Sequence, residues 1–167
     1  MNGDDQDMEK DVKNWVTILG KMARIENALT ELYRRAGVAC ASDADFWGNM
    51  AGEEANHAAV IGAMANLVIK RKGAGFSSNR VFTVAALDTF QKIVEGNLSS
   101  LKDGKLNGKK VYYAAKDLES ALMETRYWQL LKTEDQGYMD LMRLVEDETM
   151  AHRARLEERI RSLQPGE

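Results

Sequence analysis

The chain contains a single cysteine, Cys40, and a single proline, Pro165, among its 167 residues. One cysteine excludes an internal disulfide framework. It also excludes a rubredoxin-type iron site within the chain, because such a site needs four thiolates. With proline confined to the C-terminal end, no earlier segment is barred from helix by the proline ring. Helix-forming residues such as Leu, Ala, Glu and Lys dominate instead, so the composition favours an all-α fold.

The chain also lacks an excess of positive charge and a long apolar run. Its net charge of −3 argues against nucleic acid as a partner. The N-terminus, MNGDDQDMEK, is acidic where a signal peptide would be basic and then apolar. We therefore expect no membrane segment, a cytoplasmic location, and a disordered N-terminal tail over residues 1–10.

Four long segments with helical periodicity follow this tail, and they span residues 11–37, 43–71, 108–133 and 135–163. A shorter helical segment at about 80–102 lies in the long connection between the two pairs. Its apolar face packs either on the same chain or on a second subunit. Gly37 is a candidate stop for the first helix, and Asp43 or Asp45 a candidate N-cap for the second. This order predicts an antiparallel four-helix bundle over residues 11–163, with a long crossover that carries a short extra helix.

Each of the four long segments places a carboxylate within its apolar stripe when residues are spaced at about 100°. The only two histidines of the chain fall in the stripes of the second and fourth segments. These candidate metal ligands are Glu26, Glu54, His57, Glu119, Glu148 and His152. The nearby acidic residues Glu53, Glu124 and Asp147 are expected to point to solvent.

Burying these carboxylates without partners would cost several kcal/mol each, which a protein of this size cannot sustain. A pair of divalent ions would neutralise four carboxylates, and neutral imidazoles would fill the remaining positions. Iron and manganese both accept this set of ligands. The pattern therefore predicts the donor set of a di-iron or di-manganese carboxylate protein.

Four stretches carry a resemblance to a known family: RIENALTELYRRA (24–36), DFWGNMAGEEANHAAVIGAM (45–64), KDLESALMETRYWQLL (116–131) and LVEDETMAHRARLEE (144–158). At these residues the chain resembles a rubrerythrin-type member of the ferritin-like superfamily, without a rubredoxin domain. The resemblance implies that Glu26 and Glu119 are terminal ligands and that Glu54 and Glu148 bridge. It also implies that His57 and His152 each cap one metal ion.

The second half departs from the family pattern. Glu54 and His57 form the usual E-x-x-H motif, but Glu148 and His152 are four residues apart in E-T-M-A-H. Thr149 takes the place of the usual glutamate. Spacings of three and four residues both leave two side chains on one helix face, so the site is retained as an expectation.

The resemblance implies a non-haem oxidoreductase with two iron or manganese ions that reacts with peroxide or dioxygen. Its electrons would come from a separate donor, and we expect a homodimer. Two alternatives stay open. One is ferritin-like iron oxidation and storage. The other is a ferritin-like bundle without chemistry that acts as an interaction module, which the E-T-M-A-H departure favours.

Overall fold

The computed structural model describes residues 3–79 and 83–163. They form five α-helices: α1 (Gly3–Ala39), α2 (Ala44–Lys70), α3 (Val84–Lys102), α4 (Lys109–Thr125) and α5 (Gln136–Ser162). The connections contain two 3-10 turns, η1 (Ala41–Asp43) and η2 (Tyr127–Gln129), and two short strands, β1 (Phe76–Ser78) and β2 (Leu131–Thr133). The expected all-α fold class is confirmed as five helices with antiparallel packing.

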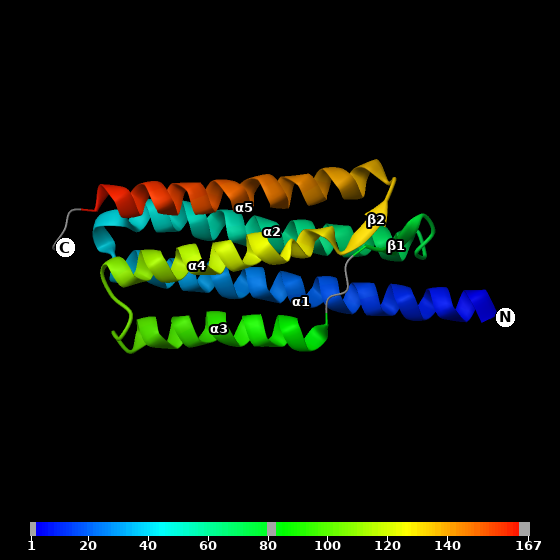
Figure 1. Cartoon of the computed structure of the whole chain (residues 1–167), viewed down its shortest axis with the longest axis horizontal. Coiled ribbons are helices and arrows are strands. Elements are labelled where there is room, and N and C mark those ends of the chain that lie inside the picture. Colours follow the sequence, from blue (N-terminus) through cyan, green and yellow to red (C-terminus); the bar gives the residue numbers. More distant parts are fainter. Residues whose placement is uncertain (1–2, 80–82, 164–167) are drawn as a thin grey trace.

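Two helix pairs make up most of the molecule. α1 and α2 run side by side in opposite directions, and so do α4 and α5 (Figure 1). α2 also packs on α5, which joins the two pairs. The apolar residues that the helices bury form one continuous core, because each stripe faces the neighbouring helices rather than solvent.

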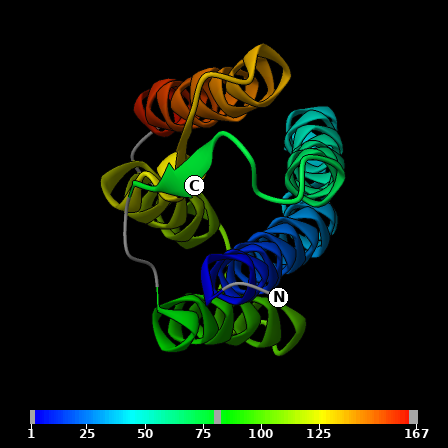
Figure 2. The same cartoon turned by 90° about the vertical axis from the view of Figure 1, so that its right-hand side faces the viewer.

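The extra helix α3 packs along α1 of the same chain, as both views show (Figures 1 and 2). It buries Leu87, Val94 and Leu101 and leaves Ile93 exposed. An ion pair between Lys21 of α1 and Asp88 adds to this contact. The apolar face of α3 is therefore covered within the chain.

The segment expected as one helix over 108–133 is interrupted, and that expectation was wrong for residues 126–133. α4 ends at Thr125 because Arg126 adopts a left-handed conformation (φ 46°), with its N–H bonded to the carbonyl of Leu122. The chain then forms η2 and β2, and β2 pairs antiparallel with β1. The apolar residues that extended the helical pattern are buried in these turns and in the strand.

The corner between α1 and α2 also differs from expectation. Gly37 does not stop α1, which continues to Ala39; a Cβ atom on Gly37 would lie 3.3 Å from the Cβ of Trp47. Its small size therefore serves the close approach of α2. Asp43 precedes α2, but its side chain makes no capping hydrogen bond. It accepts hydrogen bonds from Tyr112 and Arg159 instead.

α1 begins at Gly3, so the part of the expected tail that is described is helical. The turn after α2 packs against this first part of α1. A Cβ atom on Gly73, at φ 77°, would lie 2.6 Å from Val12 and 2.7 Å from the sulfur of Met8. The division into a tail over 1–10 and a domain over 11–163 stays a prediction. Within the described residues, no helix is both long and apolar enough to cross a membrane.

Candidate metal centre

Five of the six predicted ligands are buried together in the core. Glu26 comes from α1, Glu54 and His57 from α2, Glu119 from α4 and His152 from α5, and each is at most 1% exposed. The sixth, Glu148 of α5, has a side chain that is 33% exposed. The structure thus brings four helices to one cluster, with Glu148 at its edge.

Glu54 lies at the centre of the cluster. Its Oε2 atom is 3.0 Å from Nδ1 of His57, and its Oε1 atom is 2.8 Å from Nδ1 of His152. The two imidazole rings stack with centroids 5.3 Å apart. One ligand atom from each of Glu54, His57 and His152 lies within 4.8 Å of the other two. This buried group could hold a metal ion.

Glu26 and Glu119 flank this group with oxygen atoms that lack partners. Among the described residues, neither oxygen of Glu26 has a well-aligned hydrogen bond, and Oε2 of Glu119 has none. The other oxygen of Glu119 accepts a hydrogen bond of 2.5 Å from the Tyr33 hydroxyl. Burial, and then the charge on Glu54, hold the pKa of Glu26 well above its usual value. Burial and the charge on Glu119 likewise raise the pKa of Glu54 to about 7.

The outer nitrogen of each histidine faces a half-exposed carboxylate. Nε2 of His57 is 2.8 Å from Oε2 of Glu148, and Nε2 of His152 is 2.7 Å from Oε2 of Glu53. Arg155 donates two hydrogen bonds to Glu53 and fixes its position. Burial lowers the pKa of His152, but hydrogen bonds to Glu119 and Glu54 outweigh it and raise this pKa to about 11.

Thr149 occupies an inner position on α5. It is 1% exposed, and its hydroxyl donates a hydrogen bond of 2.8 Å to the carbonyl of Val145. Glu148, its neighbour, is turned toward the edge of the helix face. This position does not test whether Glu148 binds a metal ion, so the predicted ligand role of Glu148 stays a prediction.

Sequence reasoning missed Glu53. We expected it to point to solvent, and that was wrong in part, because its carboxylate reaches His152 on α5. The signal was its place at the edge of the α2 stripe, beside Glu54. Tyr33 was visible as a buried aromatic residue, but its bond to Glu119 joins residues 86 positions apart. The expectations for Glu124 and Asp147 are confirmed, since both are exposed.

The donor set fits a divalent cation. The cluster contains buried atoms without a well-aligned hydrogen bond, and they belong to Glu26, Glu54, Glu119 and His152. Each would cost free energy if it were left without a partner. A cation would accept these lone pairs, and carboxylate with imidazole is a combination that iron, manganese and zinc all accept.

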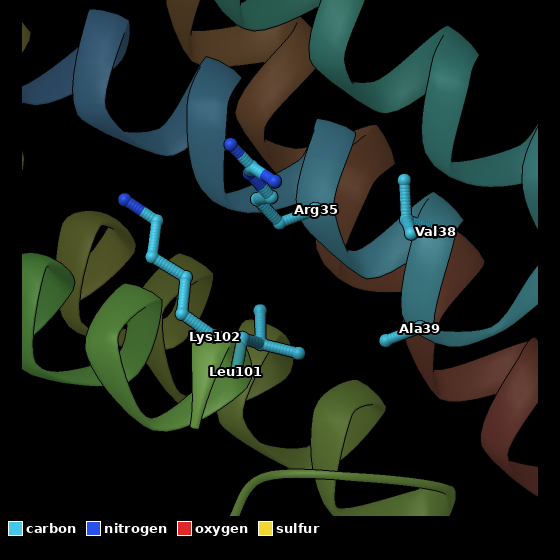
Figure 3. A pocket seen from close by; sticks show the side chains of 5 residues that line it. All are labelled: Arg35, Val38, Ala39, Leu101 and Lys102. Carbon is cyan, nitrogen blue, oxygen red and sulfur yellow. The ribbon is translucent and has the colours of Figure 1, made fainter. Parts of the chain in front are cut away.

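A surface pocket of about 360 Å³ lies elsewhere, between the C-terminal ends of α1 and α3. Figure 3 shows its lining side chains, which are Arg35, Val38, Ala39, Leu101 and Lys102. None of them belongs to the buried cluster, and the two cationic groups would repel a metal ion. The pocket is therefore no part of the candidate metal centre.

Comparison of the chain with models of protein families, with curated proteins and with solved structures finds no significant match.

Proposed function

We propose that the chain is a ferritin-like protein of the rubrerythrin type, whose buried cluster binds iron or manganese and reacts with peroxide or dioxygen. In this proposal the pairs α1–α2 and α4–α5 form the four-helix bundle, and α3 is the helix of its crossover. The motif resemblance implies two ions per chain, a separate electron donor and a homodimer. The observation that carries the proposal is the cluster of buried carboxylate and imidazole atoms that lack well-aligned hydrogen bonds.

Residues around the cluster would orient the ligand atoms of such a site. If Nε2–H of His57 and His152 donates to Glu148 and Glu53, each Nδ1 presents its lone pair to the interior. A carboxylate on the outer nitrogen raises the basicity of a ligating histidine and fixes its ring. The Tyr33 hydroxyl donates a hydrogen bond to Glu119 and fixes the position of that carboxylate. Iron or manganese bound there would supply one-electron redox chemistry in a site closed to bulk water.

Metal binding is tested by anaerobic loading with ferrous iron, desalting and elemental analysis. We expect bound iron in the unchanged protein and its loss in Glu54→Ala, because Glu54 contacts both imidazoles. Glu124→Ala, an exposed position on α4, is the control and should keep its metal. If neither iron nor manganese binds the unchanged protein, the metal proposal fails. With metal bound, peroxide consumption with a chemical reductant is the next assay.

A metal-free function is the second candidate, and one observation favours it. With its raised pKa of about 11, His152 carries a positive charge that offsets the carboxylates of Glu54 and Glu119. The cluster would then be a buried ion network within an interaction module. In that case a chelator would leave the melting temperature unchanged, whereas a metal protein would lose stability. Iron storage would use the same ligands, and size-exclusion chromatography would separate a storage cage from a homodimer.

A further inference from the structure

The two imidazole rings of the cluster make the same pattern of contacts. In each, Nδ1 faces Glu54 in the interior, and Nε2 faces a half-exposed carboxylate at the edge. The edge carboxylates are Glu148 for His57 and Glu53 for His152, and their side chains are 33% and 35% exposed. Glu148 therefore has the same place relative to His57 that Glu53 has relative to His152.

Thr149 has the place on α5 that Glu54 has on α2. Glu54 lies three residues before His57, and Thr149 lies three residues before His152. Both are buried, at 1% exposure. Thr149, however, has no carboxylate, and its hydroxyl hydrogen is donated to its own helix at Val145. The interior thus receives three carboxylates, from Glu26, Glu54 and Glu119, and none from α5.

We infer that the cluster holds one divalent ion per chain, bound by Glu54, His57 and His152, and that Thr149 replaces the carboxylate that a second ion needs. This inference rests on the proposed function in that it takes the cluster to bind metal. It differs from the two ions and the bridging Glu148 that the family resemblance implies.

The spacing of the donors supports a single ion. Ligand atoms on one ion, at bond lengths of about 2.0–2.2 Å, lie at most about 4.4 Å apart. The three groups already offer atoms within 4.8 Å of one another, so a small adjustment would close them around one ion. Two ions would stand about 3.5–4 Å apart with carboxylates between them. Glu54, the carboxylate between the two imidazoles, has no counterpart on α5.

The first test is the number of metal ions per chain in the unchanged protein. After loading with ferrous iron, and separately with Mn²⁺, elemental analysis should give one ion per chain. Two ions would overturn this inference and leave the proposed function standing. No bound ion would overturn both.

The second test restores the missing carboxylate. Thr149→Glu should double the bound metal, from one ion to two, because it recreates the E-x-x-H spacing on α5. Thr149→Val keeps the shape without the hydroxyl and should stay at one ion. Metal loss in Thr149→Val would make Thr149 a ligand and overturn the inference. A folded Thr149→Glu protein that stays at one ion would do the same.

Glu148→Gln keeps the test decisive if Thr149→Glu fails to fold. Its amide oxygen still accepts a hydrogen bond from Nε2 of His57 but carries no charge, so we expect one ion per chain at saturating metal, bound more weakly than in the unchanged protein. The matched control is Asp147→Asn, the exposed neighbour on α5. Loss of the ion in Glu148→Gln even at saturating metal, with Asp147→Asn unchanged, would show that Glu148 is a ligand, which contradicts the inference.

Discussion

The pairs α1–α2 and α4–α5 contribute to the same cluster but differ in how regularly they are built. α1 has 37 residues and α2 has 27, and only a short turn separates them. α4 has 17 residues, and the chain passes through η2 and β2 before α5 begins. The first pair brings two inner carboxylates and a histidine. The second brings Glu119 and His152, with Thr149 where a second inner carboxylate would lie.

The two pairs therefore contribute different charged groups to the cluster. The first pair supplies most of the buried negative charge, which disfavours folding unless something neutralises it. The second supplies His152, a cation whose pKa is raised to about 11, and Arg155, which donates hydrogen bonds to Glu53 of α2. Neither pair satisfies all of its own buried polar groups, so we expect the links between the pairs to decide the stability of the metal-free protein.

The largest effect is expected at Trp47, which joins the pairs at the end of the core near η1. Its ring is fully buried and packs against Tyr33 of α1 at 5.7 Å and Tyr112 of α4 at 4.9 Å between centroids. Trp47→Ala should lower the free energy of unfolding by about 3–5 kcal/mol, because it opens a cavity between the pairs. Urea denaturation measures this loss. Phe46→Ala, at a half-buried neighbour, should cost less, and equal losses would show that Trp47 is no special link.

The next effect is a loss of metal-free stability as the pH rises. The pKa of Glu54 is raised from 4.5 in the unfolded chain to about 7, so its contribution is complete below pH 4.5 and disappears as pH passes 7. His152 acts in the same direction above pH 6.5, since its folded pKa is about 11. The metal-free protein should therefore be less stable at pH 8 than at pH 5, by on the order of a few kcal/mol.

Thermal unfolding across this pH range, after chelation, checks the expectation. Glu54→Gln should make the change between pH 4.5 and 7 smaller but not remove it, because the pKa of Glu26 is raised as well; the exposed control Glu124→Gln should keep the full change. Asp43 and Glu53 do not contribute to this change in stability. Their pKa values are lowered, so they affect stability only at more acidic pH. Bound metal should reverse the slope, since its ligands must lose protons. Stability that increases with pH without metal would contradict this account.

The sequence allowed the buried faces and most of the cluster to be predicted, for a physical reason. In regular helices, periodicity fixes which side chains share a face, and Glu26, Glu54, His57, Glu119 and His152 all lie where it placed them. The pattern could not predict the break at Arg126, because the apolar residues that follow fit a helix as well as a buried turn.

Glu53 and Glu148 show a second limit of the sequence. Both lie at the edge of an apolar face, where a long flexible side chain can turn to solvent or to a neighbouring helix. Which way it turns depends on a partner about 100 residues away along the chain, such as His152 for Glu53. Periodicity within one helix contains no information about that partner. The same holds for Tyr33 and Glu119.

The bond between Tyr33 and Glu119 is a smaller link that tests whether the pairs depend on each other. Tyr33→Phe removes the 2.5 Å hydrogen bond that Glu119 accepts from α1, and should cost about 1–3 kcal/mol. Tyr138→Phe is the matched control, because that hydroxyl is buried without a hydrogen-bond partner among the described residues. Its removal should leave stability unchanged or slightly higher. Equal losses in urea denaturation would mean that ring packing, not the bond to Glu119, explains the effect.

The smallest effect is expected where the end of α5 meets the corner of α1 and α2. Arg159 donates two hydrogen bonds of 2.5 Å to Asp43, which also accepts one from Tyr112 of α4. Because Arg159 is about one-third exposed, solvent screens this pair, and Arg159→Ala should cost only about 1 kcal/mol. Arg153→Ala removes an exposed pair with Glu157 within α5 and should cost less than half of that. If urea denaturation gives equal losses for the two variants, the contact with Asp43 contributes no more than an ordinary surface pair, and the polar links between the helix pairs that matter are those at the buried cluster.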